Sequence, residues 1–368
     1  MKSRRFYLLY SLSMGGVEKA FLGHLSTIDF TKTEVHLGIF FKKGALLDCL
    51  PPEVIVHWIR DYEKYWSYIN DPPRLTLERA FKSLNITQGI ALSIIFAGCK
   101  ISGSRLLLFN YISRAIPLSK DSFDEAYAFA GPSNLIDYYI CKKTRATKKY
   151  GWVHFDISHF GIDKGLIRRL YRQYEKIYVV SREARDVFIQ CFPEFTDKTE
   201  VIYNVVTPTI VRDLAESAPT FNDSFTGRRL LTVGRISQEK GQQTAIRAMK
   251  LVLDKYPKTR WYFVGEGKDL AECQALTHQE GLDDSVVFLG LQKNPYGYMR
   301  DCDLYVQPSR HEGYCITLAE ALCFNKPVVA TSFLGAREQL EGKTDSWIAE
   351  CTPESIAASI VSALSSLE

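Results

Sequence analysis

Short apolar runs alternate with longer stretches of helical pattern through the first half of the chain. A buried strand is predicted over residues 5–12, and a helix over residues 17–25 follows it directly after Gly15-Gly16. The later runs resemble strands in length and hydrophobicity, and strands are predicted at 35–40, 54–58, 126–130, 149–154 and 177–180. Strands separated by helices in this way favour a parallel, doubly wound sheet.

The same alternation restarts in the second half. Residues 206–227 lack a clear hydrophobic period and contain Pro208, Pro219 and Gly227, so a linker is predicted there. Strands are then predicted at 229–233, 261–264, 286–289, 304–307 and 328–331, with helices between them. This pattern predicts an α/β protein of two Rossmann-like domains facing a cleft, residues 1–205 and 228–368, with residues 74–117 as a helical insertion in the first.

Composition agrees with two ordinary globular domains. A chain of 368 residues is too long for one compact core, and 46% hydrophobic with 24% charged residues excludes a disordered protein. The longest uncharged run, residues 83–99, contains Asn85, Gln88 and Gly89 and falls short of the roughly 20 apolar residues that a spanning helix needs. We therefore expect no membrane-spanning helix.

Cysteine usage and net charge limit the compartment and the partners. The nine cysteines stand singly with no C-x-x-C pair, which argues against a disulfide framework or a structural zinc site and indicates a reducing, cytoplasmic compartment. A net charge of +4 is only mildly basic. It is compatible with an anionic ligand or membrane surface, and we expect no nucleic-acid partner and no cofactor.

Two turns are suited to phosphate. Gly15-Gly16 lies between a predicted strand and a helix, where the backbone of the helix start can approach an anion; a simple tight turn is the alternative. Arg235 and Lys240 lie in one loop at the carboxyl end of the first strand of the second domain. Two cations there would neutralise a diphosphate leaving group, and we expect both side chains to be exposed in the empty cleft; an ordinary charged surface loop is the alternative.

A third element spans residues 308–323. Glu312-Gly313 forms a predicted turn before a helix that begins near Ile316, so the amides from Tyr314 and Cys315 onward are natural donors to phosphate. Glu320 stands inside an otherwise apolar helix face, where a carboxylate is unfavourable unless it is bonded. A ligand hydroxyl and a buried salt bridge are both possible partners.

These motifs together resemble the family 4 group of retaining glycosyltransferases, which have the two-domain GT-B fold. The resemblance rests on Gly-Gly-Val-Glu at 15–18, Val-Gly-Arg-x-x-x-x-Lys-Gly at 233–241, and Glu-Gly followed after six residues by Glu320. It runs from residue 5 to about 365, and Asp-Leu-Tyr-Val-x-Pro-Ser at 303–309 adds to its specificity.

The resemblance implies roles for particular residues. Gly16, Arg235 and Lys240 would bind the diphosphate of a UDP- or GDP-sugar, Glu312 the donor sugar and Glu320 the ribose, while His154 would lie near the reacting sugar. The expected catalytic set is Glu312, His154, Arg235 and Lys240. The expected donor-binding set is Gly15, Gly16, Arg235, Lys240, Glu312, Gly313, Tyr314, Cys315, Ile316 and Glu320.

No metal is expected in this reaction. The only Asp-x-Asp, at Asp301 and Asp303, precedes a predicted strand and so belongs to the wrong edge of the sheet for the donor. His154 and His159, five residues apart, are a poor set of metal ligands. The resemblance implies that the leaving phosphate takes the acceptor's proton, with the anomeric configuration retained.

The acceptor is expected to be a glycan or a lipid-linked saccharide, and the resemblance points to bacterial capsule or other surface polysaccharide synthesis. Basic residues in the insertion, among them Arg74, Arg79 and Lys100, together with pairs such as Arg168-Arg169, suggest peripheral attachment to anionic lipid on the inner face of the plasma membrane. A solvated basic surface over packed helices is the alternative.

Two other functions remain open on the sequence: a catalytically silent GT-B scaffold that only binds a nucleotide sugar, and a GT-B sugar-nucleotide epimerase. Members of the family usually finish with a helix that crosses back onto the first domain. This chain stops soon after the helix predicted at 354–367, as a fragment of a longer protein would.

Overall fold

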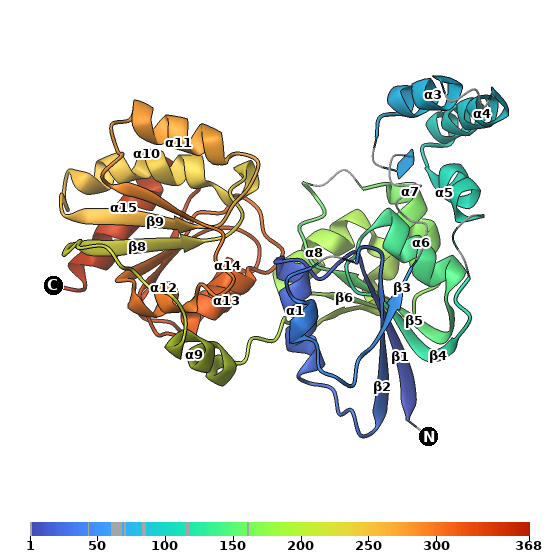
Figure 1. The fold of residues 1–368 in the computed structure, drawn as a ribbon, viewed down its shortest axis with the longest axis horizontal. Coiled ribbons are helices and arrows are strands. Elements are labelled where there is room, and N and C mark those ends of the chain that lie inside the picture. The colour runs from blue at the N-terminus through green and yellow to red at the C-terminus, as the bar shows by residue number, and fades with distance from the viewer. Residues whose placement is uncertain are drawn as a thin grey trace. The chain divides into compact units, whose positions relative to one another are not determined.

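The computed structural model describes residues 2–42, 44–59, 68–69, 71–82, 86–114, 116, 118–159 and 162–368. The chain forms two units, shown in Figure 1. Unit 1 comprises Met1–Val179 and Arg185–Ile202, and unit 2 comprises Val180–Ala184 and Tyr203–Glu368. The chain therefore contributes a short piece, residues 180–184, to unit 2 well before the predicted boundary.

Within the described residues, unit 1 contains a seven-stranded sheet with the order β3-β2-β1-β4-β5-β6-β7, and every neighbouring pair is parallel. The strands are β1 (Ser3–Leu9), β2 (Thr33–Ile39), β3 (Ile55–Trp58), β4 (Ser122–Ala128), β5 (Arg145–Val153), β6 (Lys176–Val179) and β7 (Thr199–Val201). The order reverses direction at β1, which is the doubly wound pattern expected from the sequence. The three-residue edge strand β7 was not predicted.

The helices of unit 1 fall into two groups. Those between strands of the sheet are α1 (Gly16–Leu25), α6 (Asn134–Lys143), α7 (Lys164–Tyr171) and α8 (Arg182–Cys191), whose first turn belongs to unit 2. The segment between β3 and β4 contains α3 (Pro73–Lys82), α4 (Ile86–Ser102) and α5 (Leu106–Ser113). In the described residues, the predicted insertion is thus helical.

Unit 2 repeats the plan with six parallel strands among its residues, in the order β10-β9-β8-β11-β12-β13. The strands are β8 (Arg228–Val233), β9 (Thr259–Val264), β10 (Val286–Gly290), β11 (Leu304–Gln307), β12 (Val328–Thr331) and β13 (Ser346–Ala349). The helices are α9 (Pro208–Glu216), α10 (Gln242–Leu253), α11 (Leu270–Gln279), α12 (Tyr296–Asp301), α13 (Ile316–Leu322), α14 (Ala336–Leu340) and α15 (Pro353–Ser365). Strand β13 was not predicted.

Alternation of side chains along the strands builds two cores, one on each face of the unit 2 sheet. Leu230 and Trp261 pack into a cluster with the helices α10 and α15. Their neighbours Leu231 and Tyr262 point to the opposite face, against α12, α13 and α14. Because successive strand residues alternate in direction, near-continuous apolar strands such as β8 bury both faces.

The prediction of an aperiodic linker at residues 206–227 is wrong in part, because helix α9 occupies its first half. Pro208 contributed to the prediction of a linker. Proline is nevertheless well tolerated in the first helical turn, where its missing N–H costs no hydrogen bond. Val211 and Ala215 are buried. Arg300 Nη1 donates to the Ala215 carbonyl at 2.8 Å, so contacts with α12 fix this helix.

In the part of the chain that the structure describes, none of the helices is both long and apolar enough to cross a membrane.

Candidate functional site

The carboxyl ends of β8 and β11 lie side by side in unit 2, because these two strands pair directly. The loop of residues 234–241 follows β8, and the loop of residues 308–315 follows β11. Loops that follow adjacent parallel strands meet at one edge of the sheet, which is where α/β domains bind their ligands. Most of the expected donor-binding residues belong to these two loops.

Gly241 allows the two loops to approach each other. It has a φ of +74° at the start of α10, and a Cβ at this position would overlap the carbonyl oxygen of Pro308. The Arg310 N–H donates to the Glu239 carbonyl at 2.8 Å, and the Arg310 guanidinium donates to Thr244 Oγ1 at 2.8 Å. The glycine therefore serves a close backbone approach in addition to a left-handed turn.

Lys240 forms an ion pair with Glu312 across the two loops. The Nζ–Oε1 distance is 2.5 Å, and Ser309 Oγ donates to the same carboxylate oxygen at 2.8 Å. Burial disfavours the charged ammonium, but the charge and hydrogen bond of Glu312 outweigh it, so the pKa of Lys240 is raised. The expectation that Lys240 would be exposed is wrong: its side chain is 19% exposed, because it lies against Glu312.

A chain of buried polar side chains supports Glu312. Tyr305 donates its hydroxyl to Gln307 Oε1 at 2.8 Å, and Gln307 Nε2 donates to Ser309 Oγ at 2.9 Å. Ser309 in turn donates to Glu312. These bonds run from the sheet to the loop, so the orientation of the Glu312 carboxylate is fixed from β11.

Arg235 is an exposed cation of this edge. Its carbonyl accepts a hydrogen bond of 2.9 Å from Gln242 Nε2, which holds the loop at the start of α10. The Arg235 guanidinium acts against the charge of Lys240 and is one of the causes that lower the Lys240 pKa. The positive charge of Arg235 at this edge is compatible with the expected anionic ligand.

The start of α13 offers fewer free amides than expected. Cys315 is its N-cap residue, and the side-chain amide of Gln339 bonds the backbone of Cys315. The Gln339 oxygen accepts from the Cys315 N–H at 3.3 Å, and the Gln339 nitrogen donates to the Cys315 carbonyl at 3.1 Å. The N–H of Cys315 is therefore occupied. Of the amides from Tyr314 to Thr317 that were predicted to bind phosphate, this leaves those of Tyr314, Ile316 and Thr317 to consider.

Glu320 is buried in α13, as the sequence indicated, and its carboxylate Oε1 accepts a hydrogen bond of 2.7 Å from the Tyr296 hydroxyl. A tyrosine of α12 thus bonds one of the two oxygens of this carboxylate. No pattern in the sequence distinguishes Tyr296 from other aromatic residues of the core, so this contact was not predictable.

Residues 180–184 brace the Glu312–Gly313 turn from within unit 2. Ser181 Oγ lies 3.3 Å from the Gly313 carbonyl and donates to it, and the Gly335 N–H donates to Glu183 at 2.6 Å. Glu338 accepts from the backbone N–H groups of Arg182 and Glu183. None of these residues was predicted from the sequence, because their partners are distant in the chain.

In unit 1, Gly15 and Gly16 lie at the start of α1, as predicted. Gly15 is the N-cap residue in an extended conformation, and no atom lies within 4 Å of where a Cβ of Gly16 would be. The helix start is thus unobstructed at Gly16. The open space is compatible with a ligand that approaches the backbone closely.

His154 follows β5 and is buried, with 7% of its surface exposed. Its ring lies 4.8 Å from that of Phe129 and is parallel to that of Trp152 at 5.8 Å. Burial lowers the pKa of His154 to about 3, so the imidazole is neutral at physiological pH. The Nε2 atom is buried and has no hydrogen-bond partner among the residues that the structure describes.

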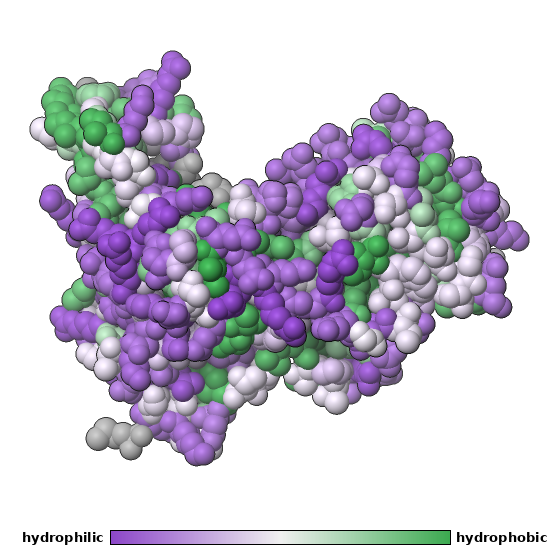
Figure 2. Space-filling view, turned by 180° about the vertical axis from the view of Figure 1, so that it is seen from behind, coloured by the Kyte–Doolittle hydropathy of each residue, from purple (hydrophilic) through white to green (hydrophobic). Residues whose placement is uncertain are grey.

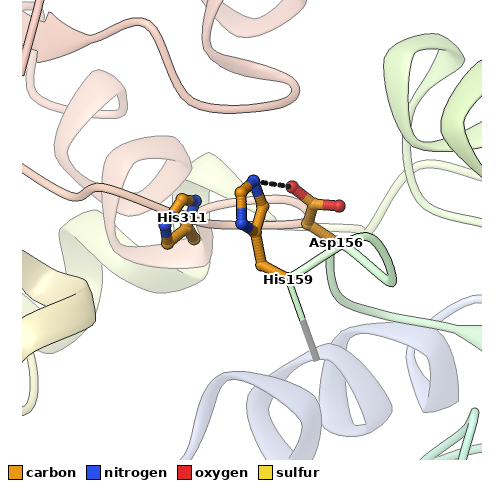
Figure 3. Close-up of side chains that lie close together, drawn as sticks. All are labelled: Asp156, His159 and His311. Carbon is orange, nitrogen blue, oxygen red and sulfur yellow. Dashed lines mark ion pairs between the residues drawn. The ribbon is translucent and has the colours of Figure 1, made fainter. Parts of the chain in front are cut away.

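Beyond His154, the chain turns at Asp156. One carboxylate oxygen of Asp156 accepts from the N–H of Ser158 at 2.9 Å, and His159 Nε2 lies 3.6 Å from the other (Figure 3).

Asp301 and Asp303 lie where α12 ends and β11 begins, and Asp303 accepts from the Arg229 N–H at 2.7 Å. Residues 301–303 thus form a helix-to-strand turn directly before β11, as expected from their position before a predicted strand.

The family model described as glycosyl transferases group 1 matches residues 222–368. An uncharacterized glycosyltransferase of Methanocaldococcus jannaschii is 30% identical over 177 residues, which are 46% of this chain and 43% of that protein. The N-acetylgalactosamine-N,N'-diacetylbacillosaminyl-diphospho-undecaprenol 4-alpha-N-acetylgalactosaminyltransferase of Campylobacter jejuni is 31% identical over 179 residues, 48% of this chain and 47% of that protein. The chain thus matches these curated relatives over about half of their length.

A comparison of folds covers the whole chain. The structure of Anabaena HepE in complex with UDP has a TM-score of 0.65 with this chain, at 18% identity, over 100% of this chain and 91% of that one. Together with the two parallel sheets, this similarity identifies a two-domain GT-B fold. Residues 222–368 are thus similar in sequence to the group 1 glycosyl transferases.

Proposed function

We propose that the protein is a retaining, metal-independent glycosyltransferase that moves a sugar from a UDP- or GDP-sugar to a glycan or lipid-linked acceptor in bacterial surface polysaccharide synthesis. The observation that carries the proposal is the arrangement at one edge of unit 2: exposed Arg235, Lys240 paired with Glu312, and the supporting chain through Ser309. We include attachment to an anionic membrane surface, because a lipid-linked acceptor resides there.

The named relatives support the same reaction class. The Campylobacter jejuni relative is named for transfer to a diphospho-undecaprenol-linked sugar, and the Anabaena structure was solved with UDP. The matched family segment contains both loops that meet at this edge, residues 234–241 and 308–315. These names suggest a nucleotide-sugar donor and a lipid-linked acceptor for this chain.

Each residue of this edge has a part in the proposed chemistry. Arg235 and Lys240 would stabilise the diphosphate as negative charge develops on the leaving group. Glu312 would bond hydroxyl groups of the donor sugar, since Ser309 and Lys240 both bind its Oε1 and so fix its orientation. Glu320 would bond the ribose, sharing its carboxylate with Tyr296.

Gly16 and His154 are proposed to act in the same reaction on the strength of the family resemblance. His154 is neutral and its Nε2 is unpaired, so a hydrogen bond to a sugar hydroxyl would satisfy a buried polar atom. A neutral histidine with a pKa of about 3 is unsuited to donate a proton at neutral pH. The proposed role of His154 is therefore to hold the sugar.

In the proposed reaction the bond between the anomeric carbon and the diphosphate oxygen breaks while the acceptor oxygen approaches from the same face. The diphosphate leaves with the bonding electron pair, and one of its oxygens takes the acceptor's proton. Positioning and electrostatic stabilisation would supply the rate enhancement.

A panel of UDP- and GDP-sugars tests the proposal. We expect one donor to raise the melting temperature of the full chain and to release free nucleoside diphosphate in the presence of the protein. A catalytically silent scaffold would bind a donor without releasing nucleoside diphosphate, and an epimerase would release it from the donor without transfer to any acceptor. No binding and no release across the panel would reject the proposal.

A further inference from the structure

Helix α4 carries apolar residues on two opposite faces. One face packs against the rest of unit 1: Leu92 is fully buried, and a side chain at Gly89 would overlap the ring of Phe81 from α3. The other face is exposed and carries four isoleucines and Ala97, with Thr87 at its border. The exposed fractions are 60% for Ile86, 52% for Ile90, 68% for Ile94 and 88% for Ile101.

These four residues, which we call the isoleucine stripe, lie in a line. Their spacing of four, four and seven residues places them on one face of a helix of 3.6 residues per turn. The stripe is roughly 22 Å long at 1.5 Å per residue. Figure 2 shows hydrophobic surface gathered over the helices of this segment. Exposed apolar surface of this extent marks an interaction site.

Positive charge is concentrated in the same segment. Residues 71–114 contain six basic and two acidic residues, a net charge of +4, which equals the net charge of the whole chain. The other residues of the protein are therefore neutral in sum. Arg74 and Lys100 are exposed, while Arg79 and Lys82 pair with Asp71 and Glu78 at the surface.

The net positive charge of residues 71–114 distinguishes between possible partners for the isoleucine stripe. A second copy of the chain would bring a segment of the same positive charge against the first, and the two would repel each other. An anionic bilayer is complementary in both respects, since its headgroups attract the basic residues and its acyl chains accept the isoleucines. Because α4 has 17 residues and falls short of a spanning helix, it suits the plane of the interface.

We propose that α4 is a membrane anchor: it lies in the surface of an anionic bilayer, with the isoleucine stripe among the acyl chains and the basic residues of 71–114 at the headgroups. This deepens the membrane attachment included in the proposed function and rests on that function only for the lipid-linked acceptor. The anchor itself requires no nucleotide sugar.

Sedimentation of the full chain with vesicles tests the anchor. Vesicles of phosphatidylcholine with 30% phosphatidylglycerol should bind the wild type, and Ile90→Ser with Ile94→Ser should weaken binding at least roughly tenfold, because two buried isoleucines are lost. The matched control is Ile210→Ser with Leu214→Ser, an exposed pair at the same spacing on α9, which should bind as the wild type does. Circular dichroism should show both variants folded.

The salt dependence of vesicle binding separates the electrostatic part of the attachment from the apolar part. Raising NaCl from 50 to 500 mM should weaken the wild type but leave residual binding, whereas Arg74→Gln with Lys100→Gln should lose much of the salt-sensitive part. Equal binding of the wild type and the isoleucine variant would overturn the anchor. So would a wild type that ignores vesicles and forms a dimer that the isoleucine variant dissociates. Donor binding is measured without lipid, so failure of the anchor leaves the proposed reaction testable.

Discussion

Lys240 and Glu312 form an ion pair whose two members have different parts in the proposed chemistry. The ammonium is proposed to face the diphosphate and the carboxylate the sugar, yet each holds the other in position at 2.5 Å. Both side chains are largely covered, so neither charge is fully hydrated. Removing one partner of such a pair leaves the other uncompensated.

Lys240→Met should therefore lower stability as well as activity. We expect a loss of about 1–3 kcal/mol in the free energy of unfolding, because Glu312 would keep only its bond to Ser309. The double variant Lys240→Met with Glu312→Gln should regain most of this loss. Urea denaturation of the wild type, both single variants and the double variant measures the coupling; additive effects would show that the pair is not coupled.

His154 should make the protein sensitive to acid. Its pKa is about 3 when folded and roughly 6.5 when unfolded, so the unfolded chain binds the extra proton between these values. Above pH 6.5 His154 is neutral in both states and does not lower the free energy of unfolding. As the pH falls, protonation of the unfolded chain lowers this free energy, by about 2 kcal/mol between pH 7 and pH 5.

His154→Gln should flatten this dependence by about the same amount, as measured by urea denaturation at several pH values. The control is His278→Gln, which removes an imidazole that is exposed at the surface. Parallel curves for the wild type and His154→Gln would contradict the buried, neutral imidazole. His24, whose burial lowers its pKa to about 4, should preserve a second acid-sensitive contribution in every variant.

At the scale of elements, the turn at Gly241 connects sequence to site. The glycine allows the 234–241 and 308–315 loops to touch, and the contact sets where Lys240 meets Glu312. The Val-Gly-Arg and Lys-Gly signals predicted the loop and its cations. They did not predict the ion pair, because that depends on two strands, β8 and β11, being neighbours in the sheet.

Gly241→Ala should destabilise unit 2 by more than backbone strain alone. We expect about 1–2 kcal/mol from the left-handed conformation and a further loss from the overlap with the Pro308 carbonyl. Gly281 is the matched control, since its φ is +68° but no atom lies within 4 Å of where its Cβ would be. If both alanine variants lose the same stability in urea denaturation, the close approach of the loops is not what requires Gly241.

The long elements of the fold were predictable from hydrophobic pattern, and the exceptions have physical causes. The edge strands β7 and β13 are short, and β13 is only half-buried, so their apolar signal is weak. Helix α9 was obscured by a proline that in fact begins it. Contacts such as Tyr296 with Glu320 depend on tertiary packing, which no local pattern records.

Taken as a whole molecule, the chain has the GT-B fold and a charged edge in unit 2 that we propose binds the diphosphate of the donor. Because Arg235 and Lys240 would do the electrostatic work of a divalent ion, transfer should proceed in excess EDTA. An α-linked donor should give an α-linked product by NMR coupling. Loss of activity with EDTA and rescue by Mg²⁺ or Mn²⁺, or a β-linked product, would contradict this part of the proposal.

The central claim is that the edge formed by the 234–241 and 308–315 loops binds the diphosphate of the donor, and calorimetric titration of the full chain tests it directly. The donor that stabilises the wild type should bind Arg235→Ala at least roughly tenfold more weakly, the scale of one charge-assisted hydrogen bond. Arg247→Ala, an exposed arginine on α10, should bind within about twofold of the wild type, since it removes an equal charge away from the two loops. Equal affinity of the wild type and Arg235→Ala, or equal weakening by both variants, would contradict the claim.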